Sequence, residues 1–134
     1  MTKPPNGKPT ILVVDDFDDI RDALRLVLEG RGYSVVAAQD GRQALHVAKE
    51  ALPSLILMDL FMPKQDGFAA ARAIRAEPEL RGVPIVAVSA YGELGIEDEL
   101  QKKARAAGFN AYVAKPFDAR ELMTLITELL AEND

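Results

Sequence analysis

The chain has 134 residues and no cysteine, and its 21 acidic against 16 basic side chains give a net charge of −5. This length fits one domain with an ordinary core, and the lack of cysteine excludes a disulfide framework and thiolate metal sites, which fits a cytosolic protein. The negative charge argues against a broad nucleic-acid-binding surface, and no apolar run is long enough to cross a membrane.

Residues 1–9 contain three prolines and a glycine, so they predict a flexible tail, and they lack the apolar segment of a secretory signal. Five short apolar runs follow, and they predict strands. Their ranges are 10–14, 33–38, 55–59, 85–88 and 111–114. Because the runs are apolar almost without interruption, we expect strands covered on both faces, as in a parallel sheet.

Apolar residues spaced three and four apart after each strand predict five helices. The first is marked by Ile20, Leu24, Val27 and Leu28, the second by Ala44, Leu45 and Ala48, the third by Phe68, Ala71 and Ile74, the fourth by Ile96, Leu100, Ala104 and Ala107, and the fifth by Leu122, Leu125, Ile126 and Leu129. Five strands alternating with five helices predict an α/β fold with helices on both faces of the sheet. Right-handed crossovers place all carboxyl ends of the strands at one edge.

Polar residues gather at this edge, because four of the five strands end in one. They are Asp15, Asp16, Asp59, Ser89 and Lys115. Each has an ordinary explanation as a helix cap, a turn residue or a surface lysine. Their coincidence at the edge where open α/β sheets bind ligands favours a functional site.

The chemistry of this set follows from charge. Three carboxylates in one pocket repel one another, and one lysine does not neutralise all three. A hard divalent cation does, and Mg²⁺ suits a few carboxylates together with water and phosphate. Such a pocket is suited to phosphoryl transfer, in which a carboxylate is able to act as the nucleophile and form an aspartyl phosphate.

The ordered motifs resemble the response-regulator receiver domains of two-component signalling, over residues 10–131. The matching pieces are Asp15-Asp16, Leu57-Met58-Asp59, Met62-Pro63, Asp66-Gly67, Ser89-Ala90 and the segment from Tyr112 to Phe117. The resemblance implies a flavodoxin-like, doubly wound, five-stranded parallel sheet of order 2-1-3-4-5. Residues 10–134 then form one receiver domain, and we expect no output domain after it.

The resemblance also implies a role for each matching acid. Asp59 matches the phosphoacceptor, which takes its phosphoryl group from a kinase phosphohistidine and also faces the metal. Asp16 matches a direct Mg²⁺ ligand, and Asp15 matches the neighbour that holds metal-bound water. The backbone carbonyl of Phe61 matches a further metal ligand.

The remaining motifs match residues that respond to the phosphoryl group. Ser89 matches the hydroxyl that bonds a phosphoryl oxygen, and Lys115 matches the ammonium that pairs with it. Tyr112 matches the switch aromatic, whose ring turns inward as that hydroxyl moves. The peptide bond before Pro116 is cis in the family.

The sequence departs from the family pattern near the site. The stretch from Ser89 to Lys115 is about four residues longer than usual, and we place the extra length at 92–95, before the fourth helix. Phe61 and Tyr91 stand two residues past the acceptor and the hydroxyl, respectively. Neither side chain activates a hydrolytic water easily, so we expect a long-lived aspartyl phosphate. Autodephosphorylation within seconds would refute this expectation.

The leading hypothesis is a single-domain, cytoplasmic switch protein rather than an enzyme, although it contributes to its own phosphorylation and dephosphorylation. Its expected partners are a sensor histidine kinase or histidine phosphotransfer protein and an unknown downstream protein, with no nucleic acid or membrane, and the chain is expected to be a monomer or weak dimer. The downstream partner would read the face of the fourth helix, fifth strand and fifth helix. The alternative is an interaction module that keeps the fold but does not depend on phosphate.

Other functions fit the residues less well. A Rossmann enzyme needs a G-x-G-x-x-G motif, which is missing. A haloacid-dehalogenase-type phosphatase needs a second acid where Phe61 stands, and a flavodoxin needs a phosphate loop where the Asp15-Asp16 pair would repel phosphate. His46, the single histidine, is interpreted as an ordinary helix-face residue rather than a phosphorelay histidine.

Overall fold

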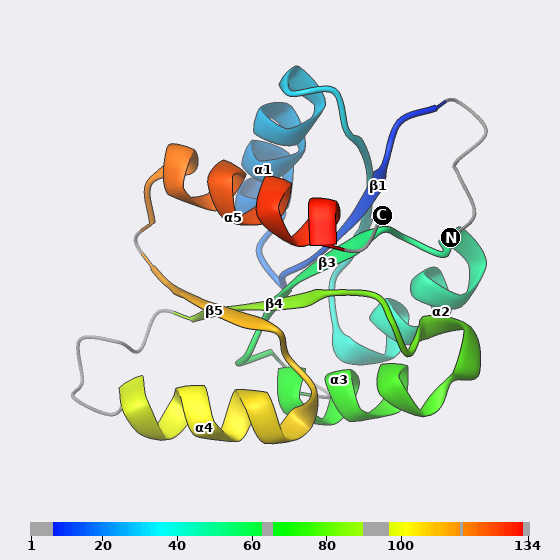
Figure 1. Ribbon diagram of the computed structural model, residues 1–134, viewed down its shortest axis with the longest axis vertical. Coiled ribbons are helices and arrows are strands. Elements are labelled where there is room, and N and C mark those ends of the chain that lie inside the picture. Colours follow the sequence, from blue (N-terminus) through cyan, green and yellow to red (C-terminus); the bar gives the residue numbers. More distant parts are fainter. Residues whose placement is uncertain (1–6, 63–65, 90–96, 116, 133–134) are drawn as a thin grey trace.

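The computed structural model describes residues 7–62, 66–89, 97–115 and 117–132, and its strands and helices alternate along the chain (Figure 1). The strands are β1 (Thr10–Val14), β2 (Ser34–Ala38), β3 (Leu55–Asp59), β4 (Ile85–Ser89) and β5 (Ala111–Ala114). The helices are α1 (Asp18–Gly30), α2 (Gly41–Ala51), α3 (Gly67–Ala76), α4 (Glu97–Ala107) and α5 (Ala119–Glu132). A short 3₁₀ helix, η1 (Pro78–Leu80), follows α3 and was not predicted from the sequence.

The strands form one parallel sheet in the order β2-β1-β3-β4-β5. The expected flavodoxin-like fold is therefore confirmed. Every residue of β3 and β4 is buried, which explains their unbroken apolar sequences, whereas the edge strand β5 is only partly buried. The strand bounds agree with the sequence to within one residue, since β2 begins at Ser34 and β4 includes Ser89.

The sheet separates two hydrophobic cores. Figure 1 shows α1 and α5 on one face and α2, α3 and α4 on the other. Successive side chains of a strand point to opposite faces. Accordingly, Leu12 and Ile56 join the core on the α2–α3–α4 face, whereas Ile11 and Leu57 join the core on the α1–α5 face. Both faces of the central strands are thus closed to water, and this leaves the ends of the strands as the place for polar groups.

Helix α1 corrects one prediction. Leu28 is fully buried and Ile20 and Leu24 are partly buried, but Val27, expected on the same apolar face, is 37% exposed, and Leu26 is 74% exposed. The face of α1 that packs against the sheet follows the spacing of four residues from Ile20 through Leu24 to Leu28, so Val27 lies at the border of this face. Among the described residues, no helix combines the length and the apolar character that crossing a membrane requires.

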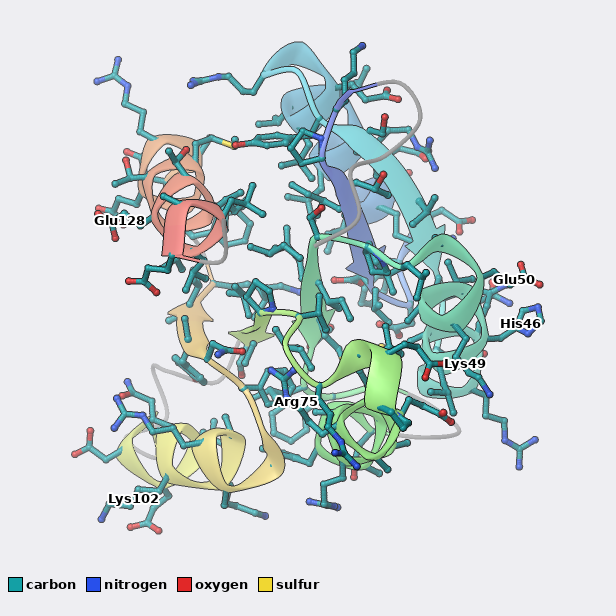
Figure 2. The ribbon with its side chains drawn as sticks, turned by 45° about the vertical axis from the view of Figure 1, so that its right-hand side comes forward. His46, Lys49, Glu50, Arg75, Lys102 and Glu128 are labelled. Atoms are coloured by element: carbon teal, nitrogen blue, oxygen red, sulfur yellow. The ribbon has the colours of Figure 1, made fainter. Side chains whose placement is uncertain are left out.

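Arg75, near the end of α3, fastens several segments at the amino-terminal edge of β4 and β5. Its guanidinium donates to the carbonyl oxygens of Gly108 at 2.8 Å and Val83 at 2.6 Å, and to Asn110 Oδ1 at 2.7 Å. The same Asn110 oxygen accepts a bond from the backbone N–H of Ile85. Figure 2 shows Arg75 directed inward between these segments. We name this arrangement the Arg75 clamp.

Candidate functional site

The acidic pair follows β1, where the chain leaves the sheet. The backbone N–H of Asp15 still donates to the carbonyl of Ala38 in β2, at 3.2 Å. The Asp15 carboxylate turns back and accepts a hydrogen bond from the backbone N–H of Phe17, at 3.0 Å. This local turn is typical of aspartate, and it ends the strand just before α1 begins. Asp15 is buried in this position, with 3% of its surface exposed.

Asp59 ends β3, and the next strand supports its position. The Asp59 carboxylate accepts a hydrogen bond from the backbone N–H of Phe61 at 3.1 Å, and the N–H of Leu60 donates to the carbonyl of Val88 at 3.2 Å. Asp59 is 7% exposed. The Asp59 carboxylate therefore lies at the carboxyl-terminal edge of the sheet, on a backbone that these hydrogen bonds hold in place.

Gly67 allows α3 to begin directly against this backbone. A Cβ atom at Gly67 would lie 2.5 Å from the carbonyl oxygen of Asp59 and 2.8 Å from Leu60 Cα, closer than such atoms approach each other. The preceding Asp66 caps the helix by accepting a bond from Ala69 N–H at 2.8 Å. In the sequence, Asp66-Gly67 was recognised only as one of the motifs that match the family, so the need for glycine on grounds of space was missed.

Lys115 connects the two buried acids. Its Nζ lies 3.1 Å from Asp15 Oδ2 and 3.5 Å from Asp59 Oδ2. The backbone N–H of Lys115 donates to the carbonyl of Ser89 at 2.6 Å, so the ends of β4 and β5 meet beside the acids. Oxygen atoms of Asp15, Asp16 and Asp59 all lie within 4.8 Å of one another. The structure therefore brings four of the predicted site residues together.

Burial dominates the electrostatics of Asp59. Loss of contact with water raises the pKa of its carboxyl group above the ordinary value, because it disfavours the charged form. The Phe61 N–H and the Lys115 ammonium lower this pKa, while the nearby charges of Asp15 and Asp16 raise it. The net result is a raised pKa, so the pocket disfavours the charged form of this carboxyl group.

The other predicted residues occupy different positions. Ser89 is fully buried at the end of β4, one residue past the partner of Asp59 in the register. Tyr112 lies within β5, three residues before Lys115, and packs against the α2–α3–α4 core. Its hydroxyl oxygen is buried and has no hydrogen-bond partner among the described residues. Tyr91, Pro116 and the segment 92–95 lie outside the described residues.

Phe61 contacts the surroundings of Asp59 through its backbone N–H and packs against a neighbouring aromatic ring through its side chain. Its ring is partly exposed, with 39% of the residue's surface accessible, and it packs edge-on against Phe68 with the ring centres 6.2 Å apart. Phe68 packs in the same way against Phe109, and Lys103 Nζ lies 5.2 Å from the centre of the Phe68 ring. An apolar, partly exposed side chain therefore stands two residues past Asp59.

His46 is remote from these residues. It lies on α2 with 71% of its side chain exposed, and its Nε2 is 3.1 Å from Glu50 Oε1. Figure 2 shows both side chains directed outward from the helix. The geometry agrees with the interpretation of His46 as a helix-face residue.

Comparison with known proteins decides the family. The model of the response regulator receiver domain matches residues 11–127. The chain belongs to the response-regulator receiver family. Receiver domains are phospho-accepting signalling modules of two-component systems, and they interact with histidine kinases or phosphotransfer proteins.

Two curated relatives of this receiver domain differ in length. An uncharacterized 14.6 kDa protein of Leptolyngbya boryana is 38% identical over 118 residues, which cover 88% of this chain and 87% of the relative. The DNA-binding dual master transcriptional regulator RpaA of Synechocystis is 34% identical over 126 residues, covering 94% of this chain and 51% of RpaA. The receiver chain therefore spans about half the length of RpaA.

A solved structure bears on the metal. The receiver domain of sensor histidine kinase PA1611 from Pseudomonas aeruginosa, described with a magnesium ion coordinated in its active-site cleft, is 34% identical, with a TM-score of 0.83 and coverage of 92% of this chain and 98% of that chain. The acids of the present receiver fit the same kind of ion. Asp16 Oδ1 is buried without a hydrogen-bond partner in the described part of the chain, and the three acids outnumber the single lysine beside them. Hard carboxylate oxygens of this kind suit Mg²⁺.

Proposed function

We propose that this receiver domain is a phosphorylation switch in which Asp59 accepts a phosphoryl group from the phosphohistidine of a sensor kinase or phosphotransfer protein. The observation that carries the proposal is the position of the Asp59 carboxylate, buried among Asp15, Asp16 and Lys115. Asp15 shares the lysine and the acidic neighbours, but it lies one residue past the end of β1, whereas Asp59 is the last residue of β3 and matches the phosphoacceptor of the family. Phosphoryl transfer depends mainly on such positioning and charge neutralisation.

In the transfer step, an Asp59 carboxylate oxygen attacks phosphorus and forms an O–P bond. The P–N bond to the donor histidine breaks, and the imidazole nitrogen keeps the electron pair. Lys115, already 3.5 Å from Asp59, pairs with a phosphoryl oxygen, and the Ser89 hydroxyl donates a hydrogen bond to another. Asp15, Asp16, Asp59 and the Phe61 carbonyl would hold Mg²⁺, which neutralises the negative charge that gathers during transfer.

We further propose that phosphorylation changes the face of α4, β5 and α5, where a downstream protein reads it. Tyr112 is the side chain expected to respond, and its buried hydroxyl without a partner supports this role, because such a group gains a hydrogen bond when its surroundings rearrange. The switch would act in the cytoplasm, which the absence of cysteine fits.

A phosphorylation assay tests the proposal. The protein is incubated with Mg²⁺ and acetyl phosphate, and its intact mass is measured beside that of Asp59→Asn. We expect the wild-type protein to gain the mass of one phosphoryl group and the variant to gain none. Removal of Mg²⁺ with a chelator should abolish the gain. A wild-type protein that stays unmodified would instead favour the phosphate-independent interaction module.

A further inference from the structure

Arg21 reaches back from the first turns of α1 to the acidic loop. Its NH1 group donates to the backbone carbonyl of Asp15 at 2.6 Å. Its other terminal nitrogen bonds the carboxylate of Asp18, which holds the guanidinium in place. The Arg21 side chain is 15% exposed, so its bond to the Asp15 carbonyl is largely shielded from water, whereas Asp18 lies at the surface with 81% of its side chain exposed. Neither charge nor motif in the sequence singles Arg21 out.

The carbonyl that Arg21 binds belongs to the peptide unit between the two acids. The Asp15 N–H donates to the Ala38 carbonyl, and the Asp15 carboxylate accepts a hydrogen bond from Phe17. These bonds hold the peptide unit before Asp15 and its side chain, but they do not hold the peptide unit that follows it. Rotation of the next peptide unit would redirect Asp16. The Arg21 bond opposes this rotation, because it holds the carbonyl oxygen at hydrogen-bond distance.

We propose that Arg21 is a positioning residue for the metal site: it fixes the Asp15–Asp16 peptide so that the Asp16 carboxylate faces the other acids. The inference rests on the proposed function, in which these acids hold Mg²⁺. Asp16 Oδ1 is buried and has no hydrogen-bond partner within the described residues, so the direction of the Asp16 carboxylate matters to any cation bound there. Loss of a partner that orients a metal ligand typically lowers metal affinity by about tenfold to a hundredfold.

Charge and positioning predict opposite effects of removing Arg21. A cationic group near the site repels Mg²⁺, so a purely electrostatic role means that Arg21→Met tightens Mg²⁺ binding. Loss of positioning weakens Mg²⁺ binding despite the removed positive charge. The direction of the change therefore identifies the role.

Arg25 provides the matched control. It lies on the same helix, its NH1 donates to the carbonyl of Val35 at 3.3 Å, and it pairs with Glu29 at 4.0 Å. Arg25→Met thus removes the same kind of side chain and a carbonyl contact, but not one in the acidic loop. Thermal unfolding of each variant shows whether α1 remains folded.

The experiment measures the Mg²⁺ dissociation constant of the unphosphorylated full chain by following backbone amide NMR signals. We expect Arg21→Met to raise this constant by about tenfold, Arg25→Met to leave it unchanged, and Arg21→Lys, which keeps a donor and the charge, to recover part of the affinity. In the metal-free protein, the Asp16 amide signal should shift in Arg21→Met and not in Arg25→Met.

Tighter or unchanged Mg²⁺ binding in Arg21→Met would refute the positioning role, as would an equal loss in Arg25→Met. If Arg21→Met does not fold, Arg21→Lys decides, because full wild-type affinity together with an unshifted Asp16 signal contradicts the proposal. A wild-type chain that binds no Mg²⁺ would overturn the proposed metal site and this inference together. A wild-type chain that binds Mg²⁺ and accepts phosphate, with Arg21→Met unaffected, would overturn this inference alone.

Discussion

The ammonium group of Lys115 lies 3.5 Å from a carboxylate oxygen of Asp59, and the same group is 3.1 Å from Asp15. A single cation from the end of β5 therefore serves two buried acids from the ends of β1 and β3. With Asp16 nearby, three carboxylates face one ammonium, which leaves an excess of negative charge when all are ionised. This imbalance explains why the pocket suits a divalent cation, which would also offset the negative charge of an incoming phosphoryl group.

Replacing Lys115 with methionine should raise the pKa of Asp59 further above its ordinary value. The lysine now favours the ionised carboxylate, and its loss leaves only the Phe61 N–H to oppose burial and the repulsion from Asp15 and Asp16. The pKa is measured in metal-free protein from the carboxyl ¹³C signal of Asp59. Lys103→Met serves as the control, since Lys103 lies over the Phe68 ring. An unchanged Asp59 pKa in Lys115→Met would contradict the assigned pairing.

Asp59→Asn should stabilise the metal-free protein at neutral pH by about 1 kcal/mol. Burial raises the pKa of Asp59, so the folded state binds its proton more tightly than the unfolded chain does. The wild-type protein therefore loses stability as the pH rises from the unfolded pKa through the folded pKa, whereas Asn has no such loss.

Urea unfolding between pH 4 and pH 8 checks the stability of Asp59→Asn, and the difference from wild type should shrink toward the acid end. Saturating Mg²⁺ should also reduce it. Asp66→Asn is the control, because Asn replaces the exposed cap without losing its acceptor. A destabilised Asp59→Asn protein at pH 7 would show that burial does not strain this carboxylate.

Gly67→Ala should destabilise the fold by about 2–3 kcal/mol. The added methyl would meet the backbone of Asp59 and Leu60, which has no freedom to rotate away as a side chain would. The free energy of unfolding is measured in urea, and phosphorylation by acetyl phosphate should fall with it. Gly30→Ala, where nothing lies within 4 Å, should change stability by less than about 1 kcal/mol. Equal effects at both positions would rule out the close approach as the cause.

Phe61→Asn should shorten the lifetime of the aspartyl phosphate by about tenfold, a change of about 1.4 kcal/mol in the barrier. An amide at this position is able to orient an attacking water by hydrogen bonding, whereas the partly exposed Phe61 ring has no polar atom with which to do so. The decay of phosphorylated protein is followed by intact mass after removal of the donor. Phe61→Leu keeps an apolar side chain and should retain the long lifetime. Loss of the wild-type phosphoryl group within seconds would disprove the prediction.

The sequence predicts the strands and their shared edge well because these depend on local patterns. A strand buried on both faces must be apolar throughout, so a run such as residues 55–58 and the acid after it define β3 and its exit. Parallel direction then places Asp15, Asp59 and Lys115 at one edge without knowledge of any contact. Right-handed crossovers between parallel strands are sufficient for this result, even though β2 and β3 are not neighbours in the sheet.

Features that depend on how helices and strands pack against one another could not be predicted from the sequence. Val27 and Leu28 are neighbours with similar side chains, and only the packing angle of α1 decides that Val27 is exposed. Arg21 is a long side chain with many carbonyls in reach, so its bond to Asp15 has no signature in the sequence. The space needed at Gly67 also arises only when α3 packs against β3.

The Arg75 clamp has a mechanical consequence. Val83 and Gly108 precede β4 and β5, so the clamp lies roughly 15 Å from the edge that holds Asp59, about the length of a five-residue strand. It ties the carboxyl-terminal end of α4 to α3 and leaves no such guanidinium tie among the described residues at the other end of that helix. If the proposed phosphorylation displaces α4, we therefore expect the amino-terminal end of this helix to move farther than the end that Arg75 holds.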